Sequence, residues 1–109
     1  METKILDDIR KLIGPDTVSV FDQDLLIHIN TYLADLTQVG VGPAEGMIAD
    51  ENTRWSDFIT NSKLIPQART YVYLKVKQVF DPAQSGFVTT ALKEAADELL
   101  WRINIDAES

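Results

Sequence analysis

The chain has 109 residues, which is close to the commonest size of a single domain. It contains no cysteine, so disulfides, Cys-ligated zinc and iron–sulfur clusters are excluded. Seventeen acidic residues against ten basic residues give a formal net charge of -7, which disfavours tight binding to the phosphate backbone of nucleic acids. No segment has the apolar length of a signal peptide or a membrane span, so we expect one domain over residues 1–109 that stays in the cytoplasm where it is made.

Apolar residues at helical spacing predict four helices, separated by segments that contain Gly and Pro. The predicted helices cover residues 3–13, 22–39, 64–80 and 86–103. Gly14-Pro15 stops the first helix, and Pro66 suits the first turn of the third. A short polar segment, 104–109, follows the last helix, and we expect it to be a flexible tail. The fold class predicted is therefore all-α, a small bundle of about four helices.

A long connection, 40–54, separates the second and third predicted helices, and its Gly-rich composition is typical of a loop. Long loops in compact domains tend to be functional or disordered. The segment lacks the G-K-[ST] ending of a phosphate-binding loop and follows a helix, so nucleotide binding is not expected there. The run Trp55 to Phe58 is predicted to be a single helical turn that anchors the far end of the loop.

Several apolar residues fall outside the buried stripes that the helical wheels predict, or lie in the loop and its anchor. Trp and Tyr are enriched at the energetic centres of interfaces, which favours a contact between subunits. Isolated exposed apolar residues are also common, and a helix buried between two layers is apolar nearly all round. Both interpretations stay open. The candidate interface residues are Ile27, Val41, Met47, Ile48, Trp55, Phe58, Tyr71, Leu74, Phe87 and Trp101.

Polar residues do not form a recognisable catalytic or metal-binding pattern. His28 is the sole histidine and is expected at the rim of the core, so a His-rich metal site is excluded. The adjacent acidic residues Asp7 and Asp8 are expected to be solvated surface charges, and Lys75 is expected to lay its stem along the apolar stripe. We therefore predict no catalytic residues, no metal and no cofactor. A small enzyme is the least favoured class.

Five short segments follow one another in a distinctive order. They are Gln38 to Gly46 (QVGVGPAEG), Trp55 to Phe58 (WSDF), Ala68 to Lys77 (ARTYVYLKVK), Phe80 to Pro82 (FDP) and Glu98 to Asn104 (ELLWRIN). Their combination and spacing, which are more specific than any one of them, resemble the phage head–tail connector, or adaptor, family. These proteins are small helical subunits that form a ring under the portal of long-tailed phages.

This resemblance implies a structural virion protein without catalytic residues. It implies a homo-oligomeric ring, dodecameric in the virion, that contacts the portal on one side and a stopper or tail-completion protein on the other. The portal contact would involve the terminal segment, in particular Asn104, Ile105 and Asp106. Duplex DNA would pass through the ring without tight binding, because part of the net charge of -7 would line the channel and repel it. The charge would equally serve solubility alone.

Two other classes remain as alternatives. A small helical adaptor or regulator of phage origin would use the same outer aromatic residues to bind another protein, without forming a ring. A helical DNA-binding regulator would need a basic recognition helix. The third predicted helix offers only Arg69, Lys75 and Lys77, on scattered faces.

Overall fold

The computed structural model describes residues 4–13, 22–43, 46, 48–80 and 86–108. Within these residues the chain forms α-helices and one short 3-10 helix, η2, and contains no β-strand. The elements are α1 (Ile5–Ile13), α2 (Asp22–Gln38), α3 (Trp55–Phe58), η2 (Ser62–Leu64), α4 (Ile65–Phe80) and α5 (Gly86–Glu108). The predicted all-α fold class is therefore confirmed, and the bounds of the first three long helices agree with the sequence prediction to within two residues.

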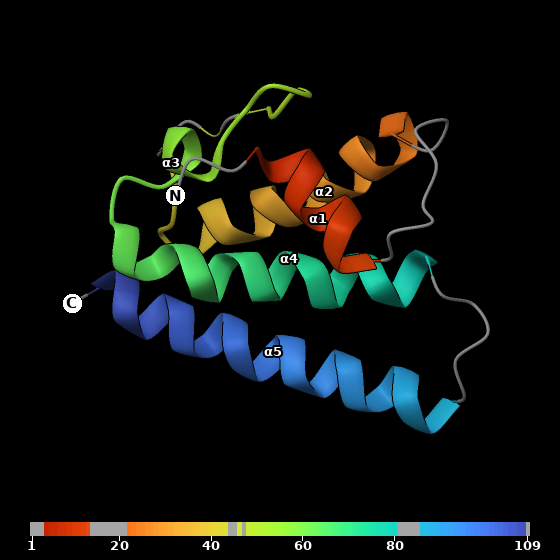
Figure 1. The fold of residues 1–109 in the computed structure, drawn as a ribbon. Helices are drawn as coiled ribbons and strands as arrows, with labels where there is room; N and C mark the ends of the chain where they lie inside the picture. The colour runs from red at the N-terminus through yellow and green to blue at the C-terminus, as the bar shows by residue number, and fades with distance from the viewer. Residues whose placement is uncertain (1–3, 14–21, 44–45, 47, 81–85, 109) are drawn as a thin grey trace.

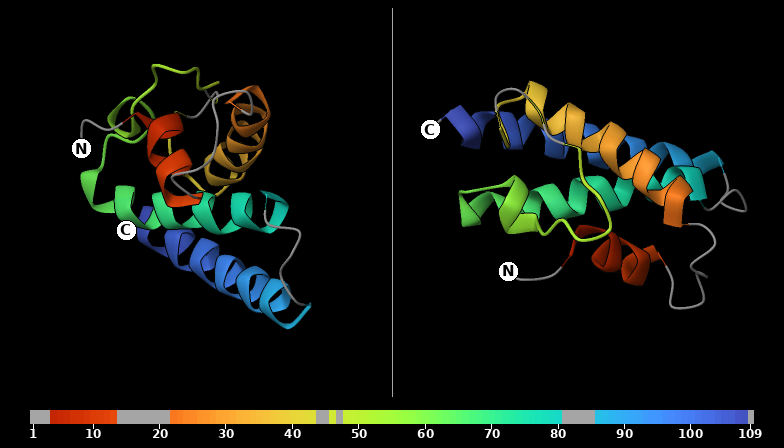
Figure 2. Two further views of the ribbon diagram at one scale, coloured as in Figure 1. Left: turned by 45° about the vertical axis from the view of Figure 1, so that its right-hand side comes forward. Right: turned by 90° about the horizontal axis from the view of Figure 1, so that it is seen from above.

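Helix α4 lies in the middle of the structure (Figure 1). Helix α5 runs along one side of it, while α1 and α2 pack on the other side. The same order is seen in both views of Figure 2, where α1 and α5 are separated by α4. The side chains of α4 consequently meet neighbours in several directions, whereas no helix of the described residues packs on the outer face of α5.

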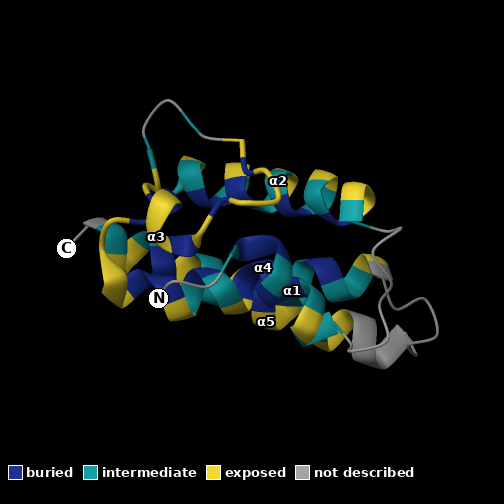
Figure 3. Cartoon of the chain, turned by 45° about the horizontal axis from the view of Figure 1, so that its top comes forward, coloured by how far each residue is buried: buried dark blue, intermediate teal, exposed yellow. Residues whose placement is uncertain are grey.

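The hydrophobic core fills the space around α4 and takes residues from every helix. Buried positions in Figure 3 follow the faces of α1, α2 and α4 that point toward one another. The three largest buried side chains are Trp55, Tyr71 and Phe58. Among residues 90–107 of α5, whose burial is described, only Ala96 and Ile103 belong to the buried core, because this part of the helix packs on α4 with one narrow face.

Three sequence predictions about burial and helix ends are wrong. Tyr71 was expected outside the buried stripe, yet its side chain is 2% exposed because α4 has buried faces toward both α2 and α5. The helical spacing of Val72, Val76 and Val79 predicts one buried stripe on the third helix, yet Val79 is 44% exposed, near the end of α4. Helix α5 was expected to end near Ile103, yet it continues to Glu108, so residues 104–108 are helical. The side chain of Gln67 donates a hydrogen bond to Asp106 and holds this last turn near the start of α4.

The long connection between α2 and α3 is attached to the core at both ends. Gly40 and Gly42 have φ values of +96° and +86°, a backbone conformation that favours glycine, and they turn the chain back after α2. Val41 between them is buried. At the far end, Lys4 and Arg54 form an antiparallel β-bridge, and the Ile5 N–H donates to the Thr53 carbonyl at 2.9 Å. The start of α1 is thereby fixed to the end of the loop.

Candidate functional site

The outer face of α5 is the most conspicuous exposed apolar surface of the described helices. Trp101 is 64% exposed and Ile105, one turn later on the same face, is 44% exposed. Acidic side chains precede them on this face, at Glu94 and Asp97. A large exposed Trp flanked by a second apolar residue is typical of a protein–protein contact.

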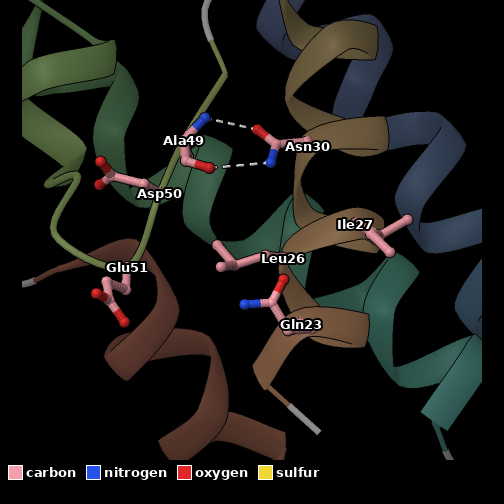
Figure 4. Close-up of a pocket in the computed structure, with 7 residues that line it drawn as sticks. All are labelled: Gln23, Leu26, Ile27, Asn30, Ala49, Asp50 and Glu51. Carbon is pink, nitrogen blue, oxygen red and sulfur yellow. Dashed lines mark hydrogen bonds between the residues drawn. The ribbon is translucent and has the colours of Figure 1, made fainter.

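A groove lies between α2 and the segment that follows the glycine-rich loop (Figure 4). Its volume is about 400 Å³, and Asp50 and Glu51 lie along the wall opposite Gln23 and Leu26. The side chain of Asn30 forms two hydrogen bonds with the backbone of Ala49, accepting at 2.7 Å and donating at 3.0 Å. The Asn30 amide thus satisfies both backbone groups of Ala49, as a neighbouring β-strand would. These two bonds hold the segment around Ala49 against α2.

Two strongly exposed apolar residues lie at or near this groove. Ile27 is one of its lining residues and is 63% exposed, and in Figure 4 its side chain is directed away from Ala49. Ile48 is 86% exposed, directly before the clamped Ala49. The neighbouring Asp50 carboxylate accepts from the Asn52 N–H and the Thr53 hydroxyl, and these bonds lower the pKa of Asp50.

A second, smaller groove of about 240 Å³ runs between α4 and α5. Leu74 and Leu99 line it with Thr70, and the exposed ion pair between Arg102 and Glu98 (2.8 Å) lies at its edge. Leu74 is half-buried and packs against the core. This candidate interface residue therefore presents only part of its side chain to a partner.

A buried charged contact joins three segments that are far apart in the sequence. Asp8 of α1 is 6% exposed, and its Oδ2 accepts a hydrogen bond of 2.8 Å from the indole Nε1–H of Trp55. The Arg69 guanidinium donates to both carboxylate oxygens, at 2.5 Å from Nε and 2.9 Å from Nη2. This hydrogen bonding raises the pKa of Arg69. Asp8 thus connects α1, α3 and α4.

A second polar contact lies between α2, α4 and α5. The Tyr71 hydroxyl donates to Asp35 Oδ2 at 2.8 Å. Burial, this hydrogen bond and the nearby charges raise the pKa of Tyr71. Lys75 is half-buried, and its ammonium lies 5.9 Å from the centre of the Tyr32 ring. His28 is half-buried at the rim of the core.

The described side chains contain no group of three or more His, Asp or Glu residues placed to hold a metal ion. No helix in the described part of the chain is both long and apolar enough to cross a membrane. What this part of the structure offers is contact surface and polar contacts that position helices.

Comparison with known protein families decides the assignment. A family model described as "Phage connector protein" matches residues 5–109. The chain belongs to the phage connector protein family. Members of this family are structural components of the phage particle, and the chain is therefore one of them. The family is structural and not enzymatic. Neither the comparison with curated proteins nor the comparison with solved structures found a match.

Within this connector, four of the candidate interface residues belong to the subunit's own core. Val41, Trp55, Phe58 and Tyr71 are each at most 2% exposed. Their side chains have little surface left for a neighbour, because the loop and the α3 turn pack onto α1 and α4. Met47 and the side chain of Phe87 lie outside the described residues. The exposed candidates are Ile27, Ile48 and Trp101, with Leu74 half-buried.

The prediction that Asp7 and Asp8 are both solvated is wrong for Asp8. The connector buries this carboxylate because an indole N–H and a guanidinium satisfy it. A signal was present in the sequence, since Asp8 lies at helical spacing between the apolar residues Ile5 and Leu12. Its partners, 47 and 61 residues further along the chain, could not be identified from that spacing.

Proposed function

We propose that this connector is a subunit of a ring that joins the phage head to the tail. In this proposal the ring lies between the portal and a stopper or tail-completion protein, and it is dodecameric on the virion. The observation that carries the proposal is the match to the phage connector family over residues 5–109. Support comes from the outer face of α5, where Trp101 is too exposed to contribute much to the subunit's own core.

The proposed ring contacts use the apolar side chains that the subunit leaves exposed. Trp101 is the principal candidate, because a desolvated Trp commonly contributes several kcal/mol, about 2–4, to an interface. Ile27 and Ile48 on the α2 side and the half-buried Leu74 are further candidates. Met47 and Phe87 are retained as candidates from the sequence. The portal contact is assigned to the last turns of α5, at Asn104, Ile105 and Asp106.

The proposed function also includes passage of DNA through the ring. Part of the net charge of -7 would face the channel, where like-charge repulsion keeps the duplex from adhering to the wall. A gel-shift measurement at low salt tests this part. Assembled rings should leave linear duplex unshifted at micromolar protein, and tight binding would contradict an acidic channel wall.

Electron microscopy of the connector mixed with the portal of the same phage tests the ring. Closed rings stacked coaxially on the portal are expected. Binding of single subunits to the portal without ring closure would instead favour a simple helical adaptor. The variant Trp101→Ala should lower the oligomeric mass in light scattering while helical circular dichroism is retained. Val79→Ala is the matched control, because it removes an exposed apolar side chain from a different helix, α4. It should leave the oligomeric mass unchanged.

A further inference from the structure

Three helices of the subunit lie in a row, and the two ends of the row carry opposite charge. Helix α4 is the middle member, with α1 on one side and α5 on the other in both views of Figure 2. The outward faces of α1 and α5 therefore point in nearly opposite directions. Two different faces on opposite sides of one subunit are what a head-to-tail contact between identical subunits requires.

The outward face of α5 is acidic and apolar. Glu94, Asp97, Trp101 and Ile105 recur at helical spacing along it, and all four are exposed. Helix α5 as a whole holds two basic and five acidic residues, a formal charge of -3. Its basic residue beside Trp101, Arg102, is already paired with Glu98 at 2.8 Å. A partner for this face must therefore bring positive charge.

The outward face of α1 supplies positive charge. Lys11 and Asp7 share this face, Lys11 is exposed, and Lys4 lies directly before the helix, where its ammonium donates to the Asn52 side chain at 3.4 Å. The charge of Asp7 is balanced in part within the subunit, because Arg10 lies 3.6 Å from Asp7 while also pairing with Asp22 at 2.8 Å. The segment 4–13 holds three basic and two acidic residues, a formal charge of +1.

We propose that the acidic α5 face of one subunit docks on the basic α1 face of a second copy. This inference rests on the proposed ring and names the two surfaces that form its subunit contact. The carboxylates of Glu94 and Asp97 meet Lys4 and Lys11, and the ammonium of Lys11 also lies on the exposed ring of Trp101. Because the two faces differ, each subunit keeps one of each free for the next copy, so the contact propagates, and it closes as a ring when the rotation between neighbouring copies is a whole fraction of a turn.

Engineered cysteines test the contact, since the chain has none of its own. A tagged Lys11→Cys protein is mixed with an untagged Asp97→Cys protein under mild oxidation, with and without the portal. Disulfide-linked pairs between the two proteins are expected. Gln38→Cys, at an exposed position on α2, replaces Lys11→Cys in the matched control and should give little product. Dominant links between two Asp97→Cys subunits, or equal product with the control, would overturn the proposed contact.

The microscopy separates this inference from the function on which it rests. Rings on the portal without links between positions 11 and 97 overturn the contact and leave the ring intact. An absence of rings overturns both.

Charge reversal gives an independent readout on the unlinked protein. Lys11→Glu should raise the dissociation constant between subunits about three- to tenfold, and a second change in the same chain, Asp97→Lys, should restore most of the loss. Raising the ionic strength from about 0.05 M to about 0.5 M should weaken wild-type association, because salt screens the opposite charges. Association that is insensitive to both salt and Lys11→Glu would contradict the proposal.

Discussion

The two tryptophans of this connector have opposite environments. Trp55 is completely buried and its indole N–H is bound by Asp8, whereas Trp101 is 64% exposed on the outer face of α5. Trp55 lies on the side of the molecule where α1, the loop and α4 converge. Trp101 lies on a helix that packs with one narrow face. The residue type is the same, so the difference must come from how many segments pack around each position, and that comparison predicts opposite consequences for stability and assembly.

The largest expected effect comes from truncating each tryptophan in turn. Trp55→Ala should lower the free energy of unfolding by about 3–5 kcal/mol, because it leaves a cavity and removes the indole donor from the buried Asp8 carboxylate. Trp101→Ala should change it by less than about 0.5 kcal/mol, as expected for an exposed side chain. Urea unfolding followed by helical circular dichroism, at dilutions where the wild type is monomeric, measures both. Comparable losses would show that Trp101 stabilises its own subunit.

The acceptor of the Trp55 indole gives the next largest effect. Asp8→Asn removes the charge that faces Arg69, and we expect a loss of about 2–3 kcal/mol in the free energy of unfolding. Breaking a fully buried ion pair costs about 3–5 kcal/mol, but the Arg69 side chain is 35% exposed and water compensates in part. Asp7→Asn, at a carboxylate that is 45% exposed, is the matched control and should stay within about 0.5 kcal/mol. Equal losses would mean that Asp8 contributes no more than a surface charge.

The sequence was sufficient for the bounds of α1, α2 and α4, because each of these helices carries its own periodic apolar pattern and its own stop signal. Gly14-Pro15 and the glycines after α2 mark ends that local chemistry enforces. The sequence pattern was insufficient to predict which faces of α4 are buried. A helical wheel assumes one buried face, and the middle helix of a row has more than one, so Tyr71 was placed outside.

Burial of a charge depends on partners that spacing along the chain does not reveal. Asp8, unlike Asp7, has the helical spacing of the buried face, but Arg69 and Trp55 are what make its burial possible. The exposed position of Trp101, by contrast, was predicted correctly, because α5 is an edge helix and its wheel has a single buried face. The helical wheel is thus reliable for the exposed face of α5, and it fails where several packed neighbours, as at Tyr71, or partners distant in the sequence, as at Asp8, decide the burial.

The loop side of the molecule can be tested through its glycines. Gly42 and Gly46 have similar φ values, +86° and +82°, so alanine should cost about 1 kcal/mol or more at either position. A Cβ at Gly42 would also lie 2.6 Å from the ring of Phe58, while a Cβ at Gly46 would have no atom within 4 Å. Gly42→Ala should therefore exceed Gly46→Ala by about 1–2 kcal/mol in unfolding experiments. Indistinguishable losses would show that the loop shifts away from Phe58 at little cost.

The smallest effect is expected at Tyr71 of α4, which lies between α2 and α5. Tyr71→Phe removes the hydrogen bond to the half-exposed Asp35 and should cost about 1 kcal/mol at neutral pH. Burial, the hydrogen bond and the charges of Asp35 and Asp97 raise the pKa of Tyr71. The folded state therefore holds the phenol proton at a pH where the unfolded chain, with a tyrosine pKa of about 10, releases it.

The sign of the pH dependence follows from that difference. The stabilisation is complete below about pH 10 and is lost as the pH rises further, so the wild type should lose stability in alkali more steeply than Tyr71→Phe. Free energies of unfolding measured between about pH 7 and pH 11 should therefore converge as the pH rises. Parallel curves for the two proteins would show that Tyr71 ionises as easily in the folded state as in the unfolded chain, and that the α5 side leaves it open to water.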